Sequence, residues 1–244
     1  MKYNPNLADE LNRKFELEEK RKPKVIIEEK QIDSNIPQNQ YILLDKNTSS
    51  IISIDKFHYN NTWTKMHELL HKENAFMPNV SDFRLLLYLL KENKARYADG
   101  SLIKPEEQVR IYKDITEVRD PWRSEYLDAD FKVINKVLHI NYNHRTIKGV
   151  LTPQNSEKLE DCLMKDKTPG IDIASWLDNP TSQGLPRKDV KKGDLYYYAP
   201  MSDNNSVVRF FAYSDGSWLN CDGNPSYSVS ALGVRRKKFF SGNK

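Results

Sequence analysis

The pattern H-E-x-x-H, formed by His67, Glu68 and His71, has the most familiar chemistry of any motif in this chain. On a helix the two imidazoles lie one turn apart on one face, where they can bind zinc while the glutamate polarises a water molecule. A zinc peptidase of this kind also needs a third ligand and an open cleft. The nearest glutamate at a suitable distance is Glu92, which ends a later predicted helix.

A second interpretation of the same segment is an ordinary amphipathic helix. Trp63, Met66 and Leu70 would face the core, leaving both histidines partly exposed. We adopt this interpretation because a pattern with so few fixed positions recurs by chance, and we expect neither a bound metal nor a cofactor. The zinc peptidase stays open as an alternative, which metal analysis of a His67→Ala variant would test.

Two other groups carry weaker chemical signals. Cys162 and Cys221 have no fixed partner histidine, so nucleophilic catalysis is unsupported, and we expect two free thiols. Asp128 and Asp130 form an Asp-x-Asp pair that can hold a cation, although we expect them to be surface caps or turn carboxylates. These observations favour a protein that is not an enzyme.

The segment 211–230 has the composition of a binding surface. Large rings mix with small polar residues, and neither a helical nor a strand period accounts for them. Rings give contact area at low entropic cost, and small polar neighbours adapt their hydrogen bonds, as in antibody and engineered binding loops. The alternative is an aromatic-rich β-meander whose rings are buried. Residues expected in the core or anchoring the frame are Phe210, Leu219, Leu232, Trp122 and Trp176.

Apolar periods and turn residues predict the elements that would position these groups. Strands at 41–44 and 51–54 flank a polar turn, and Asn135 with Lys136 should turn a hairpin between 131–134 and 137–142. Ser81 is the expected cap of the second helix. Several short strands should follow residue 193. Helices are predicted at 63–73, 80–93, 105–118, 156–164 and 173–177.

Composition limits the class of protein. The 244 residues are 38% hydrophobic and 30% charged with a net charge of +4, which allows one substantial core. Charges of both signs are interspersed, so no specific nucleic-acid binding is expected, and the basic run at 235–238 should be a solvated tail. We find no signal peptide and no apolar run of about eighteen residues, so we expect no membrane span and a cytoplasmic or virion-associated protein.

Several short blocks together resemble the variable, or target, proteins of diversity-generating retroelements, and most closely the archaeal branch of that family. They extend over about half of the chain. A Ser-Asp-Gly turn followed by Gly-Val-Arg also resembles the sulfatase-modifying-factor subgroup of C-type-lectin folds. The blocks are residues 120–131, 140–144, 165–171, 183–186, 192–197, 203–207 and 232–235.

The resemblance implies a C-type-lectin-like scaffold that presents randomised residues to a ligand. In that family, adenine replacement in template asparagine codons yields a restricted set of residue types. Trp218 departs from this set, because a codon ending in a pyrimidine cannot encode tryptophan, so it comes from another template codon or is fixed. The implied ligand-binding positions are Phe211, Tyr213, Ser217, Trp218, Asn220, Asp222, Gly223, Ser226, Tyr227 and Val229.

The sequence therefore predicts an α+β protein with one C-type-lectin-like domain at 36–244, elaborated by N-terminal helices and strands and preceded by a charged arm at 1–35. Residues 194–235 would carry the variable region, and the expected partner is a macromolecule, with protein as the main class. Besides the zinc peptidase, the alternative on the same fold is an oxidase of the formylglycine-generating type. That chemistry would require Cys162 and Cys221 to lie close together in a cleft.

Overall fold

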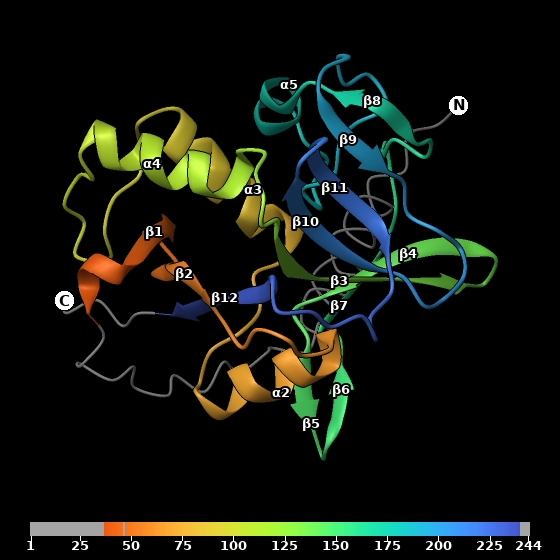
Figure 1. Ribbon diagram of the computed structural model, residues 1–244. Helices are drawn as coiled ribbons and strands as arrows, with labels where there is room; N and C mark the ends of the chain where they lie inside the picture. Colours follow the sequence, from red (N-terminus) through yellow and green to blue (C-terminus); the bar gives the residue numbers. More distant parts are fainter. Residues whose placement is uncertain (1–36, 46, 240–244) are drawn as a thin grey trace, which may run out of the picture. The chain divides into compact units, whose positions relative to one another are not determined.

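The computed structural model describes residues 37–45 and 47–239 (Figure 1). These residues form a mixed α+β arrangement with a large mixed sheet and few helices, which confirms the predicted α+β class. The charged arm predicted at 1–35 lies outside the described residues.

The large sheet brings together segments that are far apart in the sequence. Its strands and those of a separate hairpin are β1 (Tyr41–Asp45), β2 (Ser50–Phe57), β3 (Arg123–Ile134), β4 (Val137–Tyr142), β5 (Arg145–Ile147), β6 (Val150–Thr152), β7 (Asn155–Lys158), β8 (Lys167–Ile171), β9 (Leu195–Tyr198), β10 (Val207–Tyr213), β11 (Gly216–Gly223) and β12 (Leu232–Phe239). The main path runs β1-β2-β12-β3-β10-β11-β9-β8, while β4 pairs with β3 and β7. β12 is parallel to β3 and β11 is parallel to β9, and the other pairs are antiparallel. β5 and β6 form the separate hairpin.

Local signals set where the helices begin. The helices are η1 (Gln38–Gln40), α2 (Trp63–Lys72), α3 (Val80–Lys91), α4 (Pro105–Thr116) and α5 (Ile173–Asp178). Thr62 caps α2 through its side chain, and Pro105 opens α4 at a position where no backbone donor is needed. Asn79 and Asp82 exchange side-chain and backbone hydrogen bonds at the start of α3, so Asn79 is the cap and the prediction of Ser81 is wrong. Among the described helices, none is both long and apolar enough to cross a membrane.

The two larger hydrophobic clusters of the described residues hold most helices against the sheet. In the first, buried residues of α3, α4 and α5 pack with residues of β3, β10 and β11, and Figure 1 shows α3 and α4 side by side. In the second, α2 contributes Trp63, Met66 and Leu70, which pack against Tyr126, Val207, Leu232 and Val234. The predicted core residues Phe210, Leu219, Leu232 and Trp176 are buried, whereas Trp122 is only partly buried.

The hairpin predicted at 131–142 is confirmed. β3 and β4 pair in register up to Ile134 opposite Val137, and Asn135 and Lys136 form the turn between them. Both turn residues have positive φ angles, 51° and 66°, which a two-residue turn with the twist of the flanking strands requires.

The helix predicted at 156–164 is wrong. Residues 155–158 form the strand β7, which pairs with β4. The carboxylate of Glu157 accepts hydrogen bonds from the hydroxyl of Tyr142 and the amide of Gln183. These tertiary contacts fix the segment as a strand, because strand formation depends more on packing and pairing than on local preference.

The basic run at 235–238 is not a solvated tail. It lies in β12, and Arg235 is only 2% exposed. The guanidinium of Arg235 donates to both carboxylate oxygens of Glu125, at 2.8 and 3.3 Å, and Lys237 binds the carboxylate of Asp82. Carboxylates from distant segments thus neutralise the charges of Arg235 and Lys237, and this allows both side chains to be buried.

Candidate functional site

Successive residues of β10 and β11 point to opposite sides of the sheet, as strand geometry requires. Phe210 and Leu219 are paired across the two strands and are 1% and 0% exposed. Phe211 and Trp218 form the next pair, and both are only partly buried. The same two strands therefore have a core side and an outer side that both carry large side chains.

Stacked rings run across neighbouring strands on this outer side. The indole of Trp218 stacks on Tyr196 and Tyr198 of β9, with centroid distances of 4.4 and 5.3 Å, and on Phe211 of β10 at 5.3 Å. Trp122 sets its edge against Phe211 and Tyr213 at 6.2 and 6.1 Å. Such pairs restrict ring rotation, so the surface is organised before any ligand binds. We call this set the aromatic face: Trp122, Tyr196, Tyr198, Phe211, Tyr213 and Trp218.

Polar groups border the aromatic face. The amide of Asn220 donates to the carboxylate of Asp222 at 2.5 Å, and the guanidinium of Arg209 lies 5.2 Å from the ring of Tyr227. Burial raises the pKa of the Asp222 carboxyl, and the Asn220 hydrogen bond opposes this shift. The loop after β11 is held to the sheet by Tyr126 of β3. Its hydroxyl donates to the main-chain oxygens of Asn224 and Tyr227, at 2.9 and 2.8 Å.

The binding positions predicted from sequence divide into two groups. In the first group, Phe211, Tyr213 and Trp218 belong to the aromatic face. Asn220, Asp222 and Tyr227 border it. Ser226 is exposed in the loop after β11. Three others lie apart from the aromatic face. The hydroxyl of Ser217 donates to the main chain at the end of α4, and Val229 packs against the cluster around α2. Gly223 is buried, and a Cβ atom there would lie 2.7 Å from a main-chain oxygen of β10.

Sequence reasoning missed Tyr196, Tyr198, Trp122 and Arg209 as parts of this surface. A usable signal existed for the tyrosines, because in a strand the outer residues of a Tyr-Tyr-Tyr run share one side while the middle one faces the other. Tyr197 is indeed 0% exposed and packs in the core. No sequence signal shows that β9 would lie beside β11, since that pairing is parallel and nonlocal.

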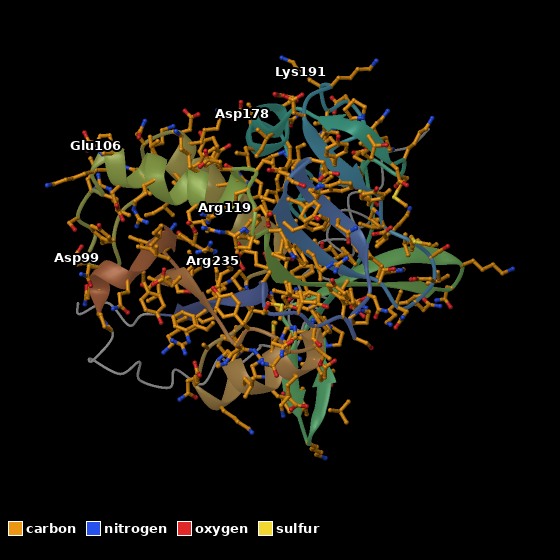
Figure 2. The ribbon with its side chains drawn as sticks, viewed as in Figure 1. Asp99, Glu106, Arg119, Asp178, Lys191 and Arg235 are labelled. Atoms are coloured by element: carbon orange, nitrogen blue, oxygen red, sulfur yellow. The ribbon has the colours of Figure 1, made fainter. Side chains whose placement is uncertain are left out.

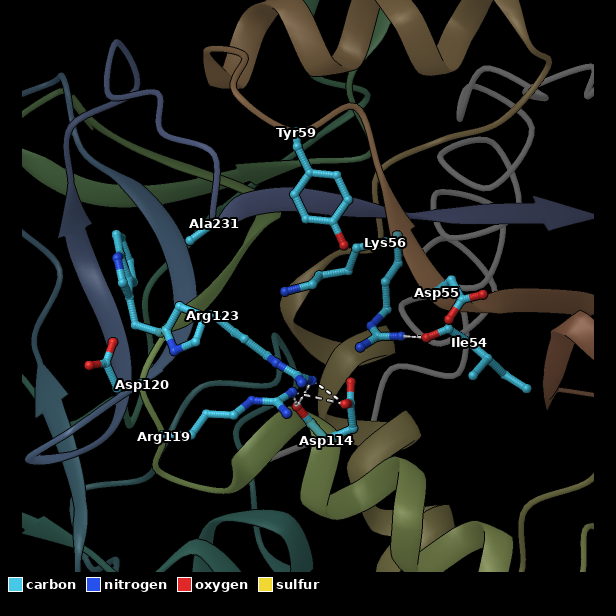
Figure 3. Close-up of a pocket in the computed structure, with 12 residues that line it drawn as sticks. Ile54, Asp55, Lys56, Tyr59, Asp114, Arg119, Asp120, Arg123 and Ala231 are labelled. Carbon is cyan, nitrogen blue, oxygen red and sulfur yellow. Dashed lines mark hydrogen bonds and ion pairs between the residues drawn. The ribbon is translucent and has the colours of Figure 1, made fainter.

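Figure 3 shows a charged pocket of about 470 Å³. Its lining includes Trp122, which also belongs to the aromatic face, so the two sites adjoin. Figure 3 shows Lys56, Arg119 and Arg123 extending into this space from different segments. The carboxylate of Asp114 pairs with Arg119 at 2.9 Å and also with Arg123. Acidic and basic side chains are mixed in the lining, so the pocket suits a polar group without a strong preference for either sign.

Three cations that line this pocket, Lys56, Arg119 and Arg235, are partly or fully buried. Burial lowers the pKa of Lys56 to about 8, and its ammonium donates to the main-chain oxygen of Ser124 at 3.1 Å. Figure 2 shows Arg119 and Arg235 among the packed side chains, whereas Asp99 lies at the periphery. Fixed cations of this kind can recognise a partner's polar groups with little loss of side-chain entropy.

Both cysteines are free thiols, as predicted, and both are buried. They share the surroundings of the Tyr197 hydroxyl, which lies 3.6 Å from the sulfur of Cys162. Burial raises the pKa of Cys162 to about 11 and that of Cys221 well above its ordinary value. Protonated thiols without solvent access are weak nucleophiles and weak metal ligands. The two sulfurs therefore lie near one hydroxyl, as an oxidase would require, but burial favours the protonated form of both thiols.

The H-E-x-x-H segment forms α2, but its geometry does not match a zinc peptidase. The carboxylate of Glu68 pairs with Lys65 at 2.9 Å, and both side chains are more than two-fifths exposed. His67 is 0% exposed, which contradicts its predicted partly exposed position. The prediction failed because the buried face of α2 includes His67 together with Trp63, Met66 and Leu70.

His67 lies in a buried cluster with Asp128 and His144. Nδ1 of His144 is 2.5 Å from Oδ1 of Asp128, and Nε2 of His67 is 3.6 Å from the same oxygen. Asp128 is 1% exposed within β3, so its predicted role as a surface cap or turn residue is wrong. Burial lowers the pKa of His67 to about 3. Burial also acts to lower the pKa of His144, but the hydrogen bond to Asp128 and the negative charges of Asp128 and Asp130 raise it to about 9.

Comparisons with known proteins identify no relative: no protein-family model, no curated protein and no solved structure matches the chain. The resemblance to the retroelement family and to the C-type-lectin fold is carried by the sequence blocks.

Proposed function

We propose that this chain is a ligand-binding display protein, in which a C-type-lectin-like scaffold presents the aromatic face to macromolecular partners, chiefly proteins. The observation that carries the proposal is the stack around Trp218, where rings from β9, β10 and β11 lie on the outer side of strands whose inner side is core. Contiguous exposed apolar surface marks interaction sites, and a stack that is organised in advance lowers the entropic cost of binding a partner.

The division between the two sides of the sheet supports this proposal. Phe210, Leu219 and Tyr197 supply the inner packing, so the backbone of the strands does not depend on which side chains occupy the outer side. Outer substitutions should therefore change affinity with little loss of stability, whereas inner ones should unfold the protein. Diversification of a binding protein requires this separation.

The composition of the face suits protein recognition. Tyr and Trp are the residues that most often dominate binding energy, and Tyr213 and Tyr227 are 46% and 40% exposed. Arg209 and Asp222 at the border can form hydrogen bonds with a partner, directly or through water. The charged pocket beside Trp122 extends the same surface with fixed polar groups.

The positions of the sequence blocks support the retroelement part of the proposal. The blocks at 120–131, 192–197, 203–207 and 232–235 contribute to β3, β9, β10 and β12, and β3 and β9 flank the β10–β11 pair in the sheet. Trp218, whose codon cannot come from a diversified asparagine, is the residue on which the other rings stack. We therefore assign Trp218 as a fixed centre and Phe211, Tyr213, Asp222 and Tyr227 as variable positions.

Neighbouring DNA provides the test of the diversification mechanism. We expect a reverse-transcriptase gene and a near-copy of the stretch encoding residues 211–230 that differs from it only at adenines. A locus with neither would refute the retroelement origin and leave a lectin-like binding protein without diversification.

A matched pair of display libraries tests the binding surface itself. One library randomises Phe211, Tyr213, Asp222 and Tyr227, and the control randomises the inner residues Phe210 and Leu219 together with Ala212 and Cys221. Both are selected against a purified probe protein such as lysozyme. We expect folded binders from the outer library alone; binders from neither library, with the outer library well folded, would contradict the proposed surface.

A further inference from the structure

The buried cluster below α2 gathers metal-binding side chains from different elements. His67 comes from the middle of α2, Asp128 from the middle of β3, and His144 follows the end of β4. One ligand atom from each residue lies within 4.8 Å of the ligand atoms of the other two. All three residues are buried, with 0%, 1% and 4% of their surfaces exposed. This cluster is separate from the aromatic face and takes no part in the proposed function.

His67 has hydrogen-bonding capacity that the described residues leave unused. Neither ring nitrogen has a hydrogen-bond partner, although the side chain is fully buried. A buried polar group without a partner costs about 1–3 kcal/mol, so native proteins rarely leave one. Imidazole in its neutral form has one ring nitrogen with a free lone pair, and this nitrogen can bind a metal ion.

The surrounding residues support metal binding. Nε2 of His144 lies 3.5 Å from Oδ1 of Asp130, an oxygen that is itself buried without a hydrogen bond. If His144 binds a metal through Nδ1, its Nε2–H is directed at this carboxylate, an arrangement common to metal-ligating histidines. The main-chain N–H of His144 donates to Oδ2 of Asp128 at 2.9 Å and orients that carboxylate. Trp63 sets its ring against His67 and His144, at 4.4 and 5.0 Å.

We propose that His67, Asp128 and His144 bind one zinc ion, which ties helix α2 to β3 and to the segment after β4. Two imidazole nitrogens and one carboxylate oxygen form a ligand set that zinc accepts, and water can take the remaining tetrahedral position. Ligand atoms around tetrahedral zinc are about 3.3 Å apart, given bonds of about 2.0–2.1 Å. The 3.6 Å contact nearly has this spacing, and the 2.5 Å contact between Asp128 and His144 would open as the ion replaces the shared proton.

Direct metal analysis of the full chain tests this site. Wild type, His67→Gln, Asp128→Asn and the control His139→Gln are incubated with zinc, desalted and assayed by mass spectrometry. His139 is a matched control because it is a histidine of β4 whose ring nitrogen contacts a nearby main-chain oxygen, outside the cluster. We expect one zinc per chain in wild type and in His139→Gln, and loss of that zinc in His67→Gln and Asp128→Asn.

Two readouts on the wild type guard against variants that fail to fold. Cobalt should replace zinc and give the intense visible absorption of a tetrahedral site with nitrogen and oxygen ligands. Zinc should raise the unfolding temperature by several degrees, and a chelator should reverse this, because the ion binds the folded state alone. Equal zinc contents in wild type and a folded His67→Gln, or no response of wild type to zinc or cobalt, would overturn the proposal and identify the cluster as a buried ion pair.

Discussion

Phe210 and Phe211 are adjacent in β10 and should respond very differently to the same substitution. Phe210 is 1% exposed, lies 5.1 Å from the ring of Phe83 and belongs to the principal core. Its replacement by alanine leaves a cavity and should cost about 3–5 kcal/mol. Phe211 is partly exposed and contacts Trp218 and Trp122 on the outer side. Its replacement forfeits ring contacts worth about 0.5–1.5 kcal/mol each and creates no sealed cavity.

Urea and thermal unfolding of the two variants measure this difference. In a domain of this size 1 kcal/mol corresponds to about 2–4 °C, so Phe210→Ala should unfold about 6–20 °C below wild type. Phe211→Ala, which loses two ring contacts, should unfold about 2–12 °C below it and clearly less than Phe210→Ala. Tyr213→Ala, at a residue that is 46% exposed, is the control and should be almost neutral. Equal losses for the two phenylalanine variants would refute the claim that the outer side can vary independently of the frame.

Three further predictions concern the frame around the face. A Cβ atom at Gly216 would lie 2.3 Å from the ring of Tyr196, so Gly216→Ala should displace that ring. We expect a loss of about 1–3 kcal/mol in the free energy of unfolding and a change in the near-ultraviolet circular dichroism. An unchanged spectrum and an unchanged stability would contradict the stack. Glu125→Ala leaves the buried guanidinium of Arg235 without its carboxylate and should cost about 3–5 kcal/mol in urea unfolding, whereas a neutral outcome would mean that water reaches the pair. The pKa of Lys56 is about 8 in the folded protein and 10.5 ordinarily, so the unfolded chain binds more protons between these pH values. The free energy of unfolding of wild type, relative to that of Lys56→Met, should therefore rise by about 3 kcal/mol as the pH increases from 8 to 10.5. A fall over this range would contradict the burial of the Lys56 ammonium.

Local sequence signals were sufficient where an element depends on its own residues. The apolar period at Phe83, Leu86, Leu87 and Leu90 predicted α3, and Asn135 with Lys136 predicted a turn that needs two positive φ angles. Neither prediction required knowledge of a distant partner. The cap of α3 was missed because Asn79 and Asp82 act as a reciprocal pair, which a search for a single serine overlooks.

Signals failed where the deciding partner is remote. The basic run looked solvated because Glu125, which neutralises Arg235, is 110 residues away in the sequence. The same limitation hid the buried cluster: His67 and Asp128 belong to separate weak motifs, and only the packing of α2 against β3 makes them neighbours. Charge and motif patterns record residue type, whereas burial depends on which segments meet.

The candidate binding surface could be predicted only in part. The composition of residues 211–230 indicated a surface rich in rings, and Phe211, Tyr213 and Trp218 do lie together. Residue type alone did not distinguish inward from outward positions, so Ser217 and Gly223 were included although they lie apart. The contribution of β9 depends on a parallel pairing that the sequence does not encode locally.

Sequencing this coding stretch in many independent copies of the same locus tests the central claim most directly. Substitutions should concentrate at Phe211, Tyr213, Asp222 and Tyr227, while Phe210, Leu219 and the stacking centre Trp218 stay unchanged. Substitutions spread evenly over inner and outer positions, or a stretch that never varies, would contradict a diversified binding face.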